Sequence, residues 1–180
     1  ERIGERVIII GNSTGATLGT WAASKPEMAQ RIAALVMMSP NYAIQGASTG
    51  LLNMPWADKL LPLVFGRERS FEPVNEQQAK WWTTSYPSIA VFPMGALLQT
   101  VSEIDYASIK VPALFILSAQ DKVVVPAITM QVHQAWGGPK QIIMLKEVGD
   151  PSAHVVAGDI LSPGNTQMVT QAILDFLVKA

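Results

Sequence analysis

The sequence predicts an α/β protein, with a parallel sheet, flanking helices and an inserted helical cap. Short apolar runs recur along the chain, and helical patterns separate them, which is typical of parallel strands joined by helical crossovers. The runs are continuous rather than alternating, as expected for strands buried on both faces. One long segment in the middle of the chain departs from this alternation and is broken repeatedly by proline.

Four apolar runs are the predicted strands. The first is followed by Gly11, the second by Ser39-Pro40, and the third is preceded by Val111-Pro112, so turn-forming residues flank these three runs. The predicted strands cover residues 7–10, 32–38, 113–118 and 141–145.

Three longer segments are predicted helices, at residues 16–24, 126–136 and 166–178. The second has Pro126 in its first turn and Gly137-Gly138 just past its end, which are favoured positions for both residue types. The third carries an apolar stripe at helical spacing, so one of its faces is expected to pack on the sheet.

The stretch between the second and third strands is too long to be a loop inside a compact domain. We therefore predict a core made of residues 1–40 and 110–180, and a helical cap made of residues 41–109. Most large apolar side chains of the cap are expected to form its own core, because pockets are few in any protein. Trp56 and Trp81 are its candidate substrate-binding residues.

Composition excludes several classes of function. The net charge of −1 provides no electrostatic footprint for nucleic acid. The apolar run at residues 32–38 is far shorter than the about 20 residues that a membrane-spanning helix needs. Without cysteine there is no disulfide or thiolate, and two histidines are too few for an ordinary zinc site. No metal or organic cofactor is expected.

The segment Gly11-Asn12-Ser13-Thr14-Gly15 matches the pattern G-x-S-x-G and lies between a predicted strand and a predicted helix. In such a sharp turn the glycines keep side chains away from neighbouring backbone. The turn lifts the serine hydroxyl clear of the sheet, and the helix N-terminus favours developing negative charge. Ser13 is the candidate nucleophile and the Thr14 backbone N–H the candidate oxyanion donor, with Asn12 a further substrate-binding candidate. The alternative is that residues 11–15 form an ordinary tight turn between a strand and a helix, without a catalytic role.

Two later loops supply the partners that a serine nucleophile needs, in the order acid and then histidine. Asp121 follows the third strand and His154 follows the fourth, and parallel sheets place their active sites at these carboxyl ends. Asp121 could instead simply cap the next helix. The other histidine, His133, falls inside a predicted helix, where a catalytic role is not expected.

These motifs resemble the α/β-hydrolase superfamily. The resemblance rests on Gly-Asn-Ser-Thr-Gly after a strand, on Ser-Ala-Gln-Asp-Lys-Val-Val-Val-Pro and on Ala-His-Val-Val-Ala-Gly. The insert after the second strand resembles the cap of lysophospholipase-like and monoacylglycerol-lipase-like members. On this resemblance Ser13 is the nucleophile, Asp121 the acid and His154 the base, although the motifs specify the superfamily and not the substrate.

The resemblance also implies four further strands before the nucleophile, which the sequence does not contain. The chain therefore looks like the C-terminal half of the fold, with its four strands contiguous and residues 7–10 at an edge. An exposed apolar edge invites pairing, so a missing N-terminal half or a second chain is expected to complete the sheet. In the family, an early loop supplies a second oxyanion donor.

The predicted activity is hydrolysis of carboxylic esters through an acyl-enzyme, as in a carboxylesterase or lipase, with apolar small-molecule esters as substrates. Two alternatives stay open. The same triad serves thioesterases and peptidases, and fold does not choose among these reactions. The chain could also be a binding protein of this fold whose triad is inactive.

Overall fold

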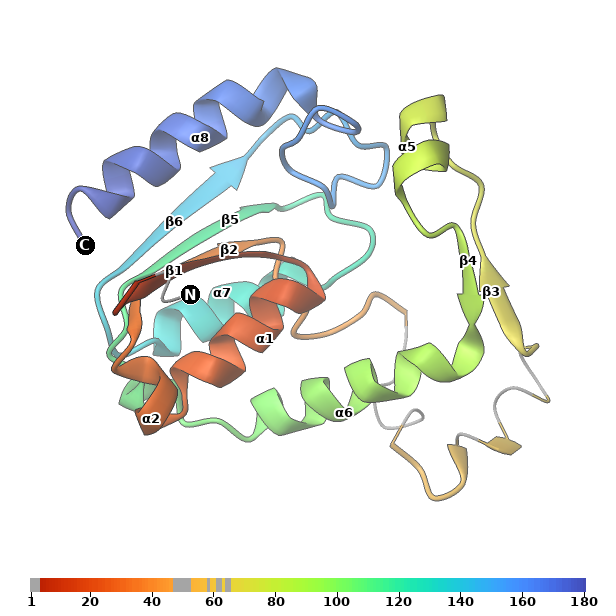
Figure 1. Cartoon of the computed structure of the whole chain (residues 1–180), viewed down its shortest axis with the longest axis horizontal. Helices are drawn as coiled ribbons and strands as arrows, with labels where there is room; N and C mark the ends of the chain where they lie inside the picture. The colour runs from red at the N-terminus through yellow and green to blue at the C-terminus, as the bar shows by residue number, and fades with distance from the viewer. Residues whose placement is uncertain (1–3, 47–52, 58, 61–62, 64–65) are drawn as a thin grey trace.

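The computed structural model describes residues 4–46, 53–57, 59–60, 63 and 66–180. Its centre is a four-stranded, entirely parallel sheet in the order β1-β2-β5-β6 (Figure 1). The strands are β1 (Val7–Asn12), β2 (Ile32–Met38), β5 (Ala113–Ser118) and β6 (Lys140–Leu145). The predicted parallel sheet, its four contiguous strands and the edge position of the first strand are thus confirmed.

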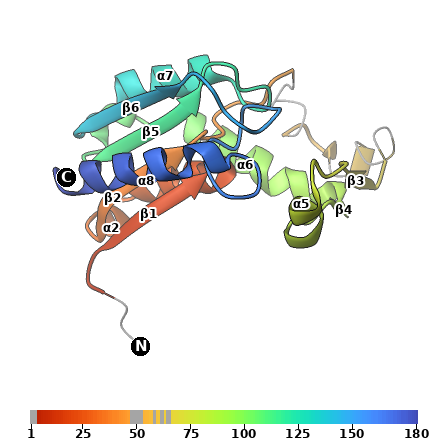
Figure 2. The same ribbon diagram turned by 90° about the horizontal axis from the view of Figure 1, so that it is seen from above.

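Helices cover both faces of this sheet (Figures 1 and 2). On one face lies α8 (Pro163–Leu177), and on the other lie α1 (Thr14–Ala23) and α7 (Pro126–Ala135). These are the three predicted helices, with ends shifted by up to three residues. A short helix that the sequence analysis did not predict, α2 (Pro26–Ala29), follows α1.

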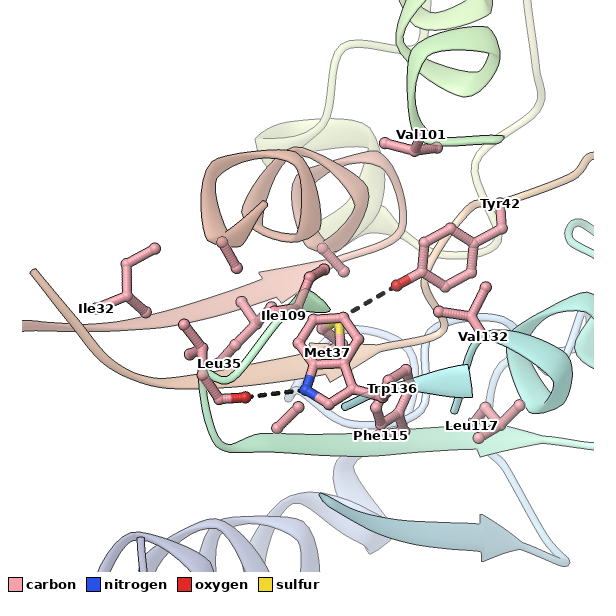
Figure 3. Packing of buried hydrophobic residues seen from close by; sticks show 14 residues of the cluster. Ile32, Leu35, Met37, Tyr42, Val101, Ile109, Phe115, Leu117, Val132 and Trp136 are labelled. Atoms are coloured by element: carbon pink, nitrogen blue, oxygen red, sulfur yellow. Dashed lines mark hydrogen bonds between the residues drawn. The ribbon is translucent and has the colours of Figure 1, made fainter. Parts of the chain in front are cut away.

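The alternation of side chains along the central strands divides the core into two clusters. Leu35, Met37 and Phe115 pack on the face of α1 and α7, whereas the intervening residues Val36 and Leu114 pack on the face of α8. Figure 3 shows the first cluster, in which the indole of Trp136 donates a hydrogen bond of 2.9 Å to the carbonyl of Val111. Both faces of β2 and β5 are therefore buried, which explains why their sequences are continuously apolar.

The described part of the segment between β2 and β5 contains two short strands, which were not predicted, as well as helices. The strands β3 (Glu68–Ser70) and β4 (Ser85–Pro87) pair as an antiparallel ladder. Helix α5 (Glu76–Trp81) lies in the connection between them along the chain. Short 3-10 turns lie at Ser88–Ala90 and Tyr106–Ser108. The strands of the ladder are only three residues long, polar and mostly exposed, so they lack the periodic signal that predicts a strand.

The C-terminal part of the predicted cap packs as part of the core. Helix α6 (Val91–Ser102) lies along α1, and its Val101 is buried in the same cluster as Met37. Ile109 also belongs to that cluster. The residues before α6 that form α5, β3 and β4 extend beyond the carboxyl ends of the sheet strands (Figure 2). Of the predicted cap, residues 47–52, 58, 61–62 and 64–65 lie outside the described residues.

Strand β1 has no second neighbour in the described part of the chain. It pairs with β2, while Ile8 and Ile10 point to the same face as Ala34 and Val36. Ile8 is 48% exposed and Ile10 54% exposed, although the equivalent positions of β2 are buried. Within the described ranges, no helix combines the length and hydropathy that crossing a membrane requires.

Candidate active site

Ser13 forms the turn between β1 and α1. Its backbone has φ 51° and ψ −124°, a region that residues other than glycine rarely occupy. The N–H of Ser13 donates to the carbonyl of Met38 at 2.9 Å, and the Ser13 carbonyl accepts from Ala16 at 3.0 Å. The neighbouring strand and the first turn of the helix therefore hold this backbone in its strained conformation, the geometry expected of a nucleophile elbow.

The two glycines of the motif have different roles. A Cβ atom on Gly11 would lie 2.6 Å from the backbone nitrogen of Ala16, so only glycine lets the helix pass this close to the strand. A Cβ on Gly15 would meet nothing within 4 Å. The steric explanation for the motif therefore holds for Gly11 and not for Gly15.

Thr14, the proposed oxyanion donor, is the first residue of α1. Backbone N–H groups in the first turn of a helix have no acceptor within the helix, so this N–H is free to bind an anion. Asn12, the last residue of β1, is exposed next to the turn.

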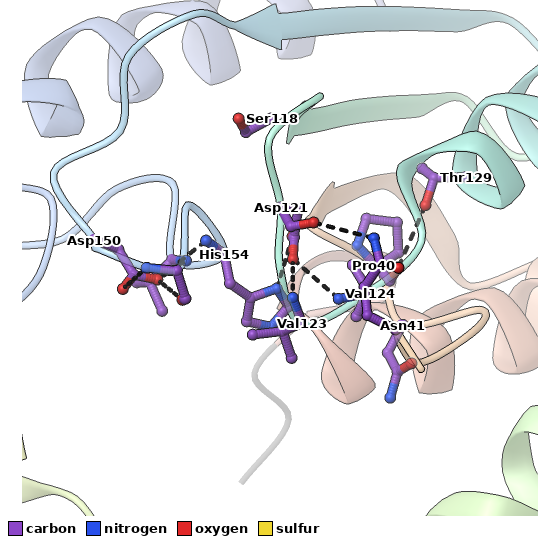
Figure 4. A network of polar contacts seen from close by, with 12 residues as sticks. Pro40, Asn41, Ser118, Asp121, Val123, Val124, Thr129, Asp150 and His154 are labelled. Carbon is purple, nitrogen blue, oxygen red and sulfur yellow. Dashed lines mark hydrogen bonds and ion pairs between the residues drawn. The ribbon is translucent and has the colours of Figure 1, made fainter. Parts of the chain in front are cut away.

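Asp121 and His154 lie in contact at the carboxyl ends of β5 and β6 (Figure 4). His154 Nδ1 is 2.8 Å from Asp121 Oδ2, and both side chains are buried. The other carboxylate oxygen of Asp121 accepts from the N–H groups of Val123 at 2.8 Å and Val124 at 2.9 Å. With the shared proton on Nδ1, the neutral imidazole keeps a lone pair on Nε2, which can accept a proton.

Asp150, which the sequence analysis did not single out, organises the backbone before His154. Its buried carboxylate accepts hydrogen bonds from the N–H groups of Ser152, His154 and Val155. Burial alone raises the pKa of Asp150, but the hydrogen bonds from Ser152, Val155 and His154 outweigh burial and hold this pKa below its ordinary value. Ala153, directly before His154, has a strained φ of 53°.

The end of β2 contributes further polar groups beside Ser13. Ser39 has a φ of 42°, and its hydroxyl is buried with no hydrogen-bond partner among the described residues. Asn41 donates its N–H to the Ser13 carbonyl at 3.3 Å and its side-chain amide to Thr14 Oγ1 at 3.3 Å. Asn41 follows Ser39-Pro40 at the carboxyl end of a strand, and this position was the only sequence signal for it.

The predicted substrate-binding tryptophans lie in the insert. Trp56 is 70% exposed with φ 61°, and Trp81 at the end of α5 is 66% exposed. Trp81 donates to Gln77 Oε1, and Lys80 lies over its ring, so its contacts are within its own helix. His133 is in α7, edge-on to Phe115, as expected for a structural residue.

No group of three His, Cys, Asp or Glu side chains in the described ranges is arranged to hold a metal ion. The reactive groups at this edge of the sheet are a serine on a strained turn, a helix N-terminus, and an imidazole hydrogen-bonded to a buried carboxylate.

The topology of the sheet, the strained turn after β1 and the acid and histidine after β5 and β6 together define an α/β-hydrolase fold, and solved structures share it. The monoacylglycerol lipase of Paleococcus ferrophilus is 17% identical with a TM-score of 0.70, covering 98% of this chain and 70% of that chain. One of the metagenome-derived lipolytic enzymes LipS and LipT is 20% identical with a TM-score of 0.66, covering 97% of this chain and 66% of that chain.

A soluble variant of the Saccharomyces cerevisiae monoglyceride lipase is 11% identical with a TM-score of 0.67, covering 97% of this chain and 62% of that chain. The chain thus spans about two thirds of the length of these structures. No protein-family model matches the sequence, and no curated protein matches it. At these low sequence identities, the structural similarity shows that the fold is shared.

Proposed function

We propose that the chain is the catalytic part of a serine hydrolase that cleaves carboxylic esters through an acyl-enzyme. His154 Nε2 takes the proton of the Ser13 hydroxyl as its oxygen attacks the ester carbonyl. Asp121 holds the imidazole in the required tautomer and stabilises its cation. The Thr14 N–H binds the oxyanion, the alcohol leaves with the proton from His154, and water then releases the acid.

The observation that carries this proposal is the buried His154–Asp121 contact of 2.8 Å, because a histidine held by a buried carboxylate is the base that a serine nucleophile requires. The strained backbone of Ser13, at the start of α1, supports it independently. These residues come from three loops at the same edge of the sheet, where parallel α/β sheets place their sites.

Apolar acyl esters are the proposed substrates. The insert beyond the strand ends exposes large apolar side chains, including Met54, Trp56, Leu60 and Trp81, and structures of the same fold are named as lipolytic enzymes and monoacylglycerol lipases. We expect 4-nitrophenyl octanoate to be hydrolysed with a higher kcat/KM than 4-nitrophenyl acetate. Faster cleavage of the acetate would contradict an apolar acyl site.

We also propose that further strands pair with β1 in the active protein, supplied by the same polypeptide or by a second chain. The support is the unpaired edge of β1 with Ile8 and Ile10 exposed. Such an addition could bring the second oxyanion donor. A missing donor of this kind costs about 10²–10³ in rate, so the 180-residue chain alone is expected to be a poor catalyst.

The test is covalent labelling of the complete gene product with a fluorophosphonate, with intact mass as the readout. We expect one adduct, located at Ser13 by peptide mapping, and its loss in Ser13→Ala. His154→Ala should slow labelling by about 10³-fold or more, whereas His133→Ala is the matched control and should label normally. A folded protein that forms no adduct would contradict the proposal and favour an inactive, binding role for the fold.

A panel of substrates then separates the related reactions. Hydrolysis of oxygen esters with little activity on thioesters or peptides is the expected result. Preference for a thioester or an amide bond would keep the triad and correct the substrate class.

A further inference from the structure

The carboxylate of Asp150 makes four hydrogen bonds, all to the segment that carries His154. Oδ1 accepts from the N–H of Ser152 at 3.0 Å, and Oδ2 accepts from the Ser152 hydroxyl and from the N–H groups of His154 at 3.0 Å and Val155 at 2.8 Å. Three backbone amides and a hydroxyl thus converge on one side chain. None of these bonds involves the imidazole, whose Nδ1 contacts Asp121.

A second group closes the same loop from its far end. The hydroxyl of Ser162, at the start of α8, accepts from the N–H of Asp150 at 3.0 Å and donates to the carbonyl of Val155. Both ends of the loop around His154 are therefore tied together. These hydrogen bonds explain how Ala153 keeps its φ of 53°. A strained backbone conformation persists only where the surrounding structure holds it in place.

The loop is also joined to the one that carries Asp121. The N–H of Lys122 donates to the carbonyl of Ser152 at 2.9 Å, and the Lys122 ammonium donates to the carbonyl of Pro151 at 2.9 Å. Asp150 fixes the turn that presents these two carbonyls. The position of Asp121 relative to His154 thus depends on a turn that Asp150 holds.

We propose that Asp150 is a positioning residue for the reaction, which sets the backbone of His154 and, through Ser152 and Lys122, the distance between the imidazole and Asp121. The inference rests on the proposed function of Ser13, Asp121 and His154. Asp150 does not touch the substrate in this scheme. Its effect is on kcat, because only the placement of the base changes and the acyl site is untouched.

The informative change is Asp150→Asn, which preserves size but removes one acceptor. Wherever its amide points, an NH₂ group then faces at least one backbone N–H that formerly had an acceptor. The turn must shift to relieve this, and misplacement of a catalytic group by about 1 Å costs on the order of 100-fold in rate. We therefore expect kcat on 4-nitrophenyl octanoate and the fluorophosphonate labelling rate to fall by about 100-fold, with KM little changed.

Two matched variants distinguish misplacement of His154 from the loss of a negative charge and from a general destabilisation of the loop. Asp159→Asn removes one negative charge from an exposed position in the same loop and should leave both rates unchanged. Ser152→Ala removes a single hydrogen bond to Asp150 and should lower kcat about three- to tenfold, which corresponds to one hydrogen bond of ordinary strength. All variants are made in the complete gene product and checked for cooperative thermal unfolding.

A spectroscopic readout tests the same point without any reaction. With ¹⁵N-labelled histidine, residues 1–180 contribute signals from two imidazoles, and the proton that His154 Nδ1 shares with Asp121 should resonate at low field. This signal is expected in the unchanged protein and in Asp159→Asn, and should move or disappear in Asp150→Asn. If Asp150→Asn fails to fold, Ser152→Ala decides, through a shifted signal and a lower kcat.

A folded Asp150→Asn protein with kcat and the low-field signal unchanged would overturn the proposal, and so would a loss expressed only as a raised KM. Failure of the proposed function looks different. In that case Ser13 in the unchanged protein forms no adduct, yet the signal still reports whether Asp150 holds His154 against Asp121.

Discussion

Strands β1 and β5 are alike in sequence but differ in their surroundings. Both are continuous apolar runs, of the kind expected for strands buried on two faces. Every residue of β5 is buried, because β2 and β6 flank it and helices cover both faces. In β1, only Gly11 is fully buried, and Ile8 and Ile10 are exposed. The apolar composition of a strand therefore predicts that the strand can be buried. Whether it is buried depends on the strands and helices that pack against it.

The largest effect that should separate the two strands is loss of a core side chain. Phe115→Ala in β5 removes a ring that is 0% exposed, so the free energy of unfolding should fall by about 3–5 kcal/mol. Ile10→Ala in β1 should change it by only about 0.5 kcal/mol, since more than half of that side chain already contacts solvent. Urea unfolding of the 180-residue chain measures both values. If both substitutions lowered the free energy of unfolding equally, the side chain of Ile10 would have to be buried in solution by a further segment or a second molecule.

A smaller effect on the free energy of unfolding is expected at Gly11, the buried residue of β1. Gly11→Ala should cost about 1–3 kcal/mol, because the new methyl group overlaps the backbone of Ala16. Gly15→Ala is the control within the same motif, and its methyl group has free space in the structure. Thermal unfolding should separate the two variants clearly. If Gly15→Ala were the more harmful change, the packing of α1 against β1 described above would be wrong.

The smallest effect concerns association through the β1 edge. The 180-residue chain should self-associate as its concentration rises, because an unpaired apolar edge is a template for pairing. Ile10→Lys should weaken that association with little effect on unfolding, and sedimentation velocity measures the change. Lys59→Gln in the insert, far from this edge in sequence, serves as the surface control. Association unaffected by Ile10→Lys would argue against the edge as a pairing surface.

Much of the candidate site could be proposed from the sequence, because strand ends are visible in it. Ser13, Asp121 and His154 each follow an apolar run, and the carboxyl ends of parallel strands meet at one edge. Asp150 could not be predicted in the same way. An aspartate four residues before a histidine in a loop is unremarkable in sequence, and only the folded backbone directs three N–H groups at its carboxylate.

The insert marks another limit of prediction from sequence. Its apolar residues suggested helices, and the ladder of β3 with β4 was missed because Glu68, Arg69 and Ser70 have no alternation. Val101 and Ile109 looked like cap residues, since they follow β2 by many positions. The place of Val101 in the core depends on how α6 lies along α1, which is a long-range contact without a local signal.

The sequence by itself determined the parallel α/β architecture, the four strands and the turn at Ser13, because these depend on local periodicity and on glycine. The tertiary structure decided which strand is exposed, which part of the insert belongs to the core, and how close the imidazole of His154 comes to Asp121. Those properties arise from contacts between segments distant in sequence, where packing and hydrogen bonding between elements outweigh local preference.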